Sequence, residues 1–248
     1  MSRQKISLLF EDNHLLVVEK PVNIPTQGDA SGDLDLLSLL KEDLKVRYQK
    51  PGQVYLGLVH RLDRPVGGVM VFAKTSKAAA RLSEQIRTGQ FRKTYLAVVH
   101  GQPEKSGRLE HFLAKDRATN TVQVSSSVAA GKKAILEYEA LMEREGLSLV
   151  RINLLTGRSH QIRVQFSTIG HPLYGDQKYG ASLNTPGQQL ALWSHQIKCL
   201  HPTKKEEMTF SSSPPPVNPW YLFFPAKSLS ISLCQIPFQE DQSPEERS

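Results

Sequence analysis

The sequence has little cysteine. Only Cys199 and Cys234 occur among its 248 residues, and no second pair stands at zinc-ligand spacing. The eight histidines do not form a metal site by their spacing either, since His171 and His201 each precede a proline and are typical of turns. We therefore expect no bound metal and a reduced, cytoplasmic setting.

Long apolar runs are also missing. No stretch approaches the roughly 18 residues that a membrane-spanning helix needs, and the N-terminus lacks the apolar core and cleavage site of a secretory signal. No repeat of solenoid length is present. With 39% hydrophobic residues, the chain is predicted to be soluble, without a membrane partner, and long enough for one sizeable domain or two small ones.

Acidic residues are outnumbered by basic ones. The chain has 31 Lys and Arg against 24 Asp and Glu, which gives a net charge of +7. This balance favours a polyanionic partner such as nucleic acid, which basic proteins bind through phosphate contacts and counterion release. Many mildly basic soluble proteins bind no polyanion, so charge alone is a weak indication.

Hydrophobic patterning predicts an α+β fold with a large mixed or antiparallel sheet. Expected strands cover a hairpin at 6–20, and runs at 54–59, 68–75, 91–101, 134–145 and 147–155. Expected helices cover 33–49, 76–89 and a segment that begins near Gly157 and ends at Gly170. The run 134–145 also fits a helix, but pairing with 147–155 favours a strand.

Two helices have predicted buried faces. Within 33–49, the buried face is formed by Leu36, Leu37, Leu40 and Leu44. Within 76–89, Ser76 is the expected N-cap, and the buried face is formed by Ala79, Leu82 and Ile86. The polar section 103–132 is expected to hold hairpins and mobile loops. Residues 1–225 are expected to form one domain, followed by a tail at 226–248 that ends in disorder.

The most charged turn of the chain is "HRLDRPVGG", which follows one β-rich run and leads into the next. His60, Arg61, Asp63 and Arg64 fall within five positions, and Gly67 and Gly68 follow. A carboxylate kept ionised by nearby cations can act as a nucleophile or a base. The alternative, favoured when the motif is taken alone, is a neutralised surface ion pair. The two glycines permit close approach of either a ligand or another strand.

Two further segments carry cations beside polar or aromatic groups. In "TGRSHQIR", the candidates are Arg158, His160, Gln161 and Arg163 at a predicted helix start, where free backbone N–H groups suit an anion. The alternative there is a basic, solvated helix start. In "FRKTYLAVV", Lys93 and Tyr95 share one strand face with Phe91. Such a tyrosine can stack on a base or carry a proton, although it is more often a core aromatic.

Together the three segments resemble RluA-type pseudouridine synthases. The resembling motifs are "HRLDRPVGGVMVFAKT", "FRKTYLAVVHG" and "GRSHQIRVQFSTIGHPLYGDQKYG", in the family's order, and the resemblance runs from "LLFEDNHLLVVEKP" to "SSSPPP". It implies one catalytic domain with a central cleft that isomerises uridine in ribosomal or transfer RNA. The N-glycosidic bond breaks, the uracil rotates, and C5 joins C1′ of the ribose. No cofactor is implied.

The resemblance also implies residue roles. Asp63 is the essential carboxylate, which either attacks C1′ or removes the C2′ proton to give a glycal; the sequence does not decide between these routes. Arg163 holds Asp63 ionised and oriented. Tyr95 stacks near the uracil and is the candidate base for the C5 proton. Arg61 fills the space left by the flipped uridine or braces it, since C1′ and C5 cannot both be reached inside a stack.

The other expected RNA contacts come from the same motifs. Arg64, Lys93 and Arg158 are candidates for backbone phosphates, and His60, His160 and Gln161 are also assigned to the RNA-binding site. Two departures affect this region, because the family often has Thr-Ser-Gly at 66–68 and His at Gln165. The resemblance starts within the first ten residues and leaves no room for the N-terminal RNA-binding domain of many relatives, so target choice would rest on loops such as those in 103–132.

Two other functions are possible. A non-catalytic RNA-binding or ribosome-assembly protein of this fold would lack Asp63, Tyr95 or Arg163, and all three are present. A glycoside hydrolase usually needs two carboxylates, whereas these motifs offer one besides Asp176. A monomeric RNA pseudouridine synthase is therefore the prediction.

Overall fold

The computed structural model describes residues 6–116, 118–125, 127 and 130–224, so the predicted tail at 226–248 lies outside the described residues. The strands are β1 (Ser7–Glu11), β2 (Leu15–Lys20), β3 (Gly57–Leu58), β4 (Gly67–Ala73), β5 (Arg92–His100), β6 (Ser106–Asp116), β7 (Thr121–Val124), β8 (Lys132–Arg144), β9 (Leu147–Leu154), β10 (Leu192–Leu200) and β11 (Glu207–Ser211). The helices are α1 (Leu36–Arg47), α2 (Ser76–Arg87), α3 (Gln161–Thr168) and a 3-10 turn at Trp220–Leu222.

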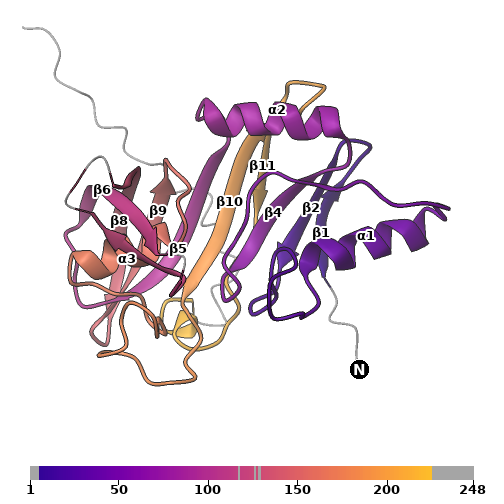
Figure 1. Cartoon of the computed structure of the whole chain (residues 1–248). Helices are drawn as coiled ribbons and strands as arrows, with labels where there is room; N and C mark the ends of the chain where they lie inside the picture. The colour runs from indigo at the N-terminus through magenta and orange to yellow at the C-terminus, as the bar shows by residue number, and fades with distance from the viewer. Residues whose placement is uncertain (1–5, 117, 126, 128–129, 225–248) are drawn as a thin grey trace, which may run out of the picture.

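All of these strands belong to one 11-stranded sheet, in the order β1-β2-β4-β10-β5-β9-β8-β6-β7, with β3 paired to β4 and β11 to β10. Among the described strand pairs only β4 and β10 run parallel. Figure 1 shows β1, β2 and α1 in one half of the molecule and β6, β8, β9 and α3 in the other, joined through β10 and β5. The predicted α+β class with a mixed sheet is confirmed.

The sheet is apolar on both faces where α1 and α2 cover it. Leu16, Val18, Met70 and Phe72 pack with α1, whereas the alternating residues Leu15, Val17, Val69 and Val71 pack with α2. Successive side chains on a strand point to opposite faces, so two strands buried on both sides are continuously hydrophobic. This explains the unbroken apolar runs in β2 and β4.

The predicted buried face of α2 is partly wrong. The helix is capped by Thr75, whose side-chain oxygen accepts the Ala78 N–H, and not by Ser76. Its buried residues are Ala78, Leu82 and Gln85, while Ala79 and Ile86 are only partly buried. Gln85 is buried because its amide donates to the Leu200 carbonyl and accepts the Leu200 N–H at the end of β10.

Other predicted elements agree with the structure, with changed ends. The segment 134–145 is a strand, β8, paired with β9 as expected. The expected strand at 54–59 is reduced to β3, and β10 and β11 had no sequence prediction. Trp220 and Phe223 pack into the core with Leu96, so the core extends past "SSSPPP". Within the part of the chain that the structure describes, no helix combines the length and apolarity needed to cross a bilayer.

Gly67 and Gly68 allow a close approach of another strand. They pair with Trp193 and Ser194 of β10, the parallel pairing in the sheet. A Cβ on Gly67 would lie 2.3 Å from a ring carbon of Trp193. Gly68 has φ +113°, and a Cβ there would lie 2.2 Å from the Ser194 carbonyl oxygen. The glycines therefore fix the start of β4 directly after the charged turn.

Replacing Gly68 by alanine is expected to lower the free energy of unfolding by about 3 kcal/mol or more, because it combines backbone strain with a clash against a carbonyl. Gly187→Ala is the matched control, since Gly187 has φ +91° but no atom within 4 Å of its built Cβ. Strain alone predicts a loss of about 1 kcal/mol there. Urea unfolding measures both, and equal losses would contradict the close-approach explanation.

Candidate active site

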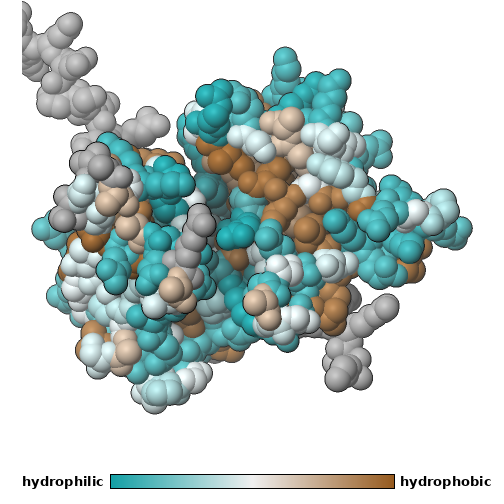
Figure 2. Space-filling view, in the orientation of Figure 1, coloured by the Kyte–Doolittle hydropathy of each residue, from teal (hydrophilic) through white to brown (hydrophobic). Residues whose placement is uncertain are grey.

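Asp63 lies in the loop between β3 and β4, at the cleft between the two halves of the sheet. The cleft holds a cavity of about 870 Å³, and Figure 2 shows the surface hollowed between the halves. A second cavity of about 600 Å³ also borders Asp63 and shares Arg61, His160 and Arg163 with the first. Cavities of this size accommodate small ligands or a single nucleotide.

Lys20, which was not a predicted site residue, holds the loop that carries Asp63 through hydrogen bonds to its backbone. Lys20 is fully buried. Its ammonium Nζ donates to the carbonyls of Pro21 at 2.9 Å, Arg64 at 3.1 Å and Val66 at 2.8 Å. Burial lowers the pKa of Lys20 to about 7, against the opposing attraction of Asp63. The available sequence signal was a lysine at the end of β2, after four apolar residues and Glu19.

Lys20→Met is expected to lower the free energy of unfolding at pH 7 by about 2–4 kcal/mol, because it leaves buried carbonyls without a donor. Lys77→Met, on the exposed surface of α2, is the control and should change little. Because the pKa of Lys20 is lowered on folding, the unfolded chain binds more protons above pH 7. The stability difference between wild type and Lys20→Met should therefore grow as pH rises from 7 toward 10. A pH-independent difference in urea unfolding would contradict the lowered pKa.

Arg163 and Asp63 are brought together, but Asp63 is not the closest partner of Arg163. The Nη1 of Arg163 lies 3.6 Å from Asp63 Oδ2. Its Nε and Nη2 donate to Asp176 at 2.7 Å each, in a buried bidentate pair. Asp176 is buried and also accepts the backbone N–H groups of Lys178 and Tyr179. Asp176 therefore fixes the guanidinium so that its remaining nitrogen faces Asp63.

The carboxylate of Asp63 is the more accessible of the two. Its side chain is 31% exposed, whereas that of Asp176 is 0% exposed. In the sequence, Asp176 was noted only as a second carboxylate of the motifs and was given no role. No local signal marks it as the partner of Arg163, 13 residues earlier in the chain.

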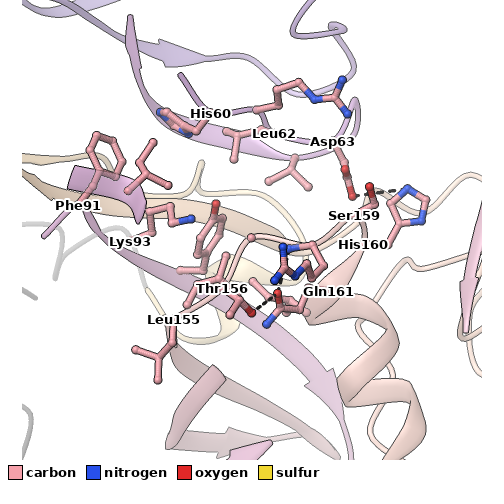
Figure 3. Close-up of a pocket in the computed structure, with 18 of the residues that line it drawn as sticks. His60, Leu62, Asp63, Phe91, Lys93, Leu155, Thr156, Ser159, His160 and Gln161 are labelled. Carbon is pink, nitrogen blue, oxygen red and sulfur yellow. Dashed lines mark hydrogen bonds and ion pairs between the residues drawn. The ribbon is translucent and has the colours of Figure 1, made fainter. Parts of the chain in front are cut away.

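His160 is the second basic side chain close to Asp63, after Arg163. Its Nε2 lies 3.9 Å from Asp63 Oδ2, the contact drawn as a dashed line in Figure 3. The residue has φ 50° and precedes α3 without capping it through its side chain. A left-handed backbone is uncommon for a residue with a side chain and is found at sites whose surroundings enforce it. Burial lowers the pKa of His160, and the Asp63 charge opposes that shift.

Tyr95 and Lys93 line the same cavity from β5. Both are buried. Burial and the nearby negative charge of Asp63 raise the pKa of Tyr95, and Ser194 partly opposes this shift. Burial lowers the pKa of Lys93. Figure 3 shows Asp63 and His160 at one end of the cavity and Lys93 with Phe91 at the other. Lys93 is thus inside the cavity and not on the outer surface.

His60 and Gln161 have clear internal partners. The His60 Nε2 accepts the Val71 N–H at 3.0 Å, which requires a neutral ring, and burial lowers the pKa of His60 to about 3. The Gln161 carbonyl oxygen accepts from the Thr156 hydroxyl and from the Arg158 N–H. Both residues line the cavity, and both shape its walls. Their predicted contact with RNA stays a prediction.

The three remaining candidates are arginines at the cavity mouths. Arg61 is exposed and reaches both cavities. Arg64 forms an exposed ion pair with Asp33. The Nε of Arg158 donates to the Lys133 carbonyl at 2.9 Å. These guanidiniums are placed where a polyanion entering the cleft would meet them.

The charge of the larger cavity is strongly unbalanced. Asp63 is the one carboxylate among its described lining residues, against six cations: Arg61, Arg87, Arg92, Lys93, Arg158 and Arg163. Within the described ranges, no three His, Cys, Asp or Glu side chains lie close enough together to hold a metal ion. The arrangement presents a single carboxylate, with a guanidinium that orients it, to a polyanion that enters the cleft.

Comparisons with known proteins agree on one family. A family model described as RNA pseudouridylate synthase matches residues 14–168. The chain is 34% identical to the uncharacterized RNA pseudouridine synthase YhcT of Bacillus subtilis, over 86% of this chain and 70% of that protein. It is 32% identical to ribosomal large subunit pseudouridine synthase D of Zymomonas mobilis, over 85% of this chain and 69% of that protein.

A solved structure shares the fold. The human RNA pseudouridylate synthase domain containing 4 matches with a TM-score of 0.69 and 23% identity, over 84% of this chain and 88% of that chain. The family model, the relatives and the three motifs all indicate the same family. Residues of the three motifs line the cavity at Asp63. The chain belongs to the RNA pseudouridylate synthase family and is an isomerase that acts on RNA.

Proposed function

We propose that this chain isomerises a uridine of large-subunit ribosomal RNA to pseudouridine, with Asp63 as the reacting carboxylate. The observation that carries the assignment of Asp63 is its position as the one carboxylate among the described lining residues of a cavity rich in cations, close to both Arg163 and His160. Relatives named ribosomal large subunit pseudouridine synthase, from Zymomonas mobilis and Haemophilus influenzae, support a ribosomal substrate. Transfer RNA is the second candidate substrate.

The uridine must leave its stack to reach Asp63. The carboxylate lies within the cleft, and both C1′ of the ribose and C5 of the uracil must come close to it during the reaction. The nucleotide is therefore flipped into the cavity of about 870 Å³. Asp63 then attacks C1′, or removes the C2′ proton to form a glycal, while the C1′–N1 bond breaks. The freed uracil rotates within the cavity. On the first route, the ester bond between Asp63 and C1′ breaks as C5 bonds to C1′; on the glycal route, C5 bonds to C1′ while protonated Asp63 returns its proton to C2′. C5 then loses its proton, and Asp63 is again a free carboxylate.

Tyr95 packs against the uracil in this proposal. Its raised pKa means that it enters the reaction as a neutral phenol. This supports stacking and orientation of the base more directly than it supports removal of the C5 proton by a phenolate. Lys93, buried in the same wall, then faces the flipped nucleotide, either its phosphate or a uracil carbonyl oxygen.

The exposed arginines bind the RNA around the flipped nucleotide. Arg61 lies between the two cavities and either fills the space left in the RNA helix or braces the extruded residue. Arg64 and Arg158 meet backbone phosphates, which position the RNA without reading its sequence. We further propose that residues 1–225 form the catalytic domain and that the enzyme works as a cytoplasmic monomer.

Mapping pseudouridine in RNA tests this function. Purified protein is incubated with unmodified ribosomal RNA fragments and with transfer RNA, and the products are mapped by primer extension after carbodiimide treatment. A new pseudouridine stop at a defined position in a large-subunit fragment is the expected result. Modification of transfer RNA alone would show that transfer RNA, and not ribosomal RNA, is the substrate. The absence of a stop in every RNA would contradict the function.

A further inference from the structure

Two hydrogen bonds link the β6–β7 hairpin through Tyr179 to His160, which lies beside Asp63. The Val122 N–H of β7 donates to the Tyr179 hydroxyl at 2.9 Å, and that hydroxyl lies 2.6 Å from Nδ1 of His160. The other ring nitrogen of His160, Nε2, faces Asp63. Tyr179 lies in the segment after α3, where its backbone N–H is bonded by Asp176.

The partners determine the direction of each bond. A backbone N–H can only donate, so the Tyr179 oxygen accepts from Val122, and its own proton is available to His160, its other hydrogen-bond partner. With Tyr179 as the donor, Nδ1 of His160 is the acceptor and the ring proton lies on Nε2, on the side of Asp63. Tautomers are set by the hydrogen bond that the other nitrogen makes.

We propose that Tyr179 is a positioning residue, which holds His160 in its neutral form with the Nε2–H directed at Asp63 and links that arrangement to the β6–β7 hairpin. The inference rests on the proposed function only for its effect on catalysis. The tautomer and the protonation state of His160 are properties of the protein without RNA.

The groups around His160 act on its protonation in opposite directions. Asp63, on the β3–β4 loop, favours the protonated ring. Burial opposes protonation, as do Arg163 of α3, Lys178 of the following segment and Lys115 of β6. Protonation at Nδ1 would also require Tyr179 to turn its O–H away. A protonated His160 would bind Asp63 as an ion pair and compete with the reaction at the sugar.

The ring of Tyr179 is held separately from its hydroxyl. It packs against the buried cluster of Leu113, Val122, Ala134 and Val164, and the Arg163 guanidinium lies 5.1 Å from its centroid. Tyr179→Phe therefore removes the hydroxyl and keeps the packing. Tyr138→Phe is the matched control. Tyr138 packs on Phe166 of α3, the helix that also contributes Val164 to the cluster around Tyr179, and it lines neither cavity at Asp63.

The first test is an NMR titration of the imidazole of His160, assigned by the signal lost in His160→Gln. In wild type, the nitrogen shifts should show a neutral ring with its proton on Nε2. Loss of the donor to Nδ1 destabilises the neutral form, so Tyr179→Phe should raise the pKa of His160 by about half a unit to one unit. Tyr138→Phe should leave it unchanged. A wild-type ring protonated on Nδ1, or an identical titration in Tyr179→Phe, would overturn the proposal.

The second test is the pH profile of pseudouridine formation. Tyr179→Phe should move the acid limb of kcat to higher pH by the same amount and leave KM unchanged, with activity recovering in alkali. A merely structural loss would reduce activity equally at every pH, and that result would overturn the positioning role. If wild type modifies no RNA, the proposed function fails while the titration still decides the role of Tyr179.

Discussion

Asp63→Asn is expected to reduce the rate of pseudouridine formation by about 10³-fold or more, while the protein stays folded and still binds RNA. The amide keeps the size of the side chain but can neither attack C1′ nor take a proton from C2′. Asp63 is 31% exposed, and its nearest basic groups, the Arg163 guanidinium and the His160 ring, lie at 3.6 Å and 3.9 Å. Its removal should therefore change the free energy of unfolding by no more than about 1 kcal/mol. Single-turnover rates with a ribosomal fragment measure the effect.

The control for this loss is Asp43→Asn. Asp43 is an exposed carboxylate of α1 that pairs with Arg47, so it undergoes the same chemical change on the surface of the protein. Its rate should equal that of wild type. Activity of Asp63→Asn within tenfold of wild type would show that another group carries the reaction.

Asp176→Asn is expected to cost stability as well as activity. The substitution removes the buried partner of Arg163, with which Asp176 forms two bonds of 2.7 Å. Breaking a buried ion pair from one side leaves an uncompensated charge and typically costs about 3–5 kcal/mol. Because Arg163 is then free to turn toward solvent, the reaction rate should also fall, by roughly tenfold or more. Urea unfolding and the single-turnover rate give the two values.

A double-mutant cycle tests whether the loss comes from the pair. Arg163→Met combined with Asp176→Asn removes both charges, so the double variant should lose less stability than the sum of the single variants. Asp33→Asn, which breaks the exposed pair with Arg64, should cost no more than about 1 kcal/mol. Additive losses in the cycle would contradict a direct interaction between Arg163 and Asp176.

Much of the fold could be predicted because its patterns are local. The alternation and length of apolar runs indicated the β1–β2 hairpin, the β8–β9 pairing, α1 and the mixed sheet. The N-cap of α2 was assigned one residue late because Thr75 and Ser76 are both good caps, and only the contact between Gln85 and Leu200 shows which face turns inward. The close approach of Gly67 and Gly68 was foreseen as an option, but its partner strand, β10, lies more than a hundred residues later.

The candidate site was predictable as a set of motifs and not as a geometry. The turn with Asp63, the strand with Tyr95 and the helix start with Arg163 do line one cavity. The residues that hold these motifs in place were missed, because their spacing in the sequence does not reveal their contacts. Lys20 binds backbone carbonyls, Asp176 forms a buried ion pair, and Tyr179 contacts His160 through its hydroxyl. Roles inferred from the motifs treated Arg163 as a partner of Asp63 alone, whereas the structure shares it between two carboxylates.

The most direct measurement is tritium release from ribosomal RNA labelled at C5 of uridine. Formation of the bond between C5 and C1′ expels the hydrogen of C5, so each turnover should release one tritium to water. Wild type in excess should release one equivalent per modified site, and Asp63→Asn none. Release by Asp63→Asn at the wild-type rate, or a mapped modification without tritium release, would contradict the account.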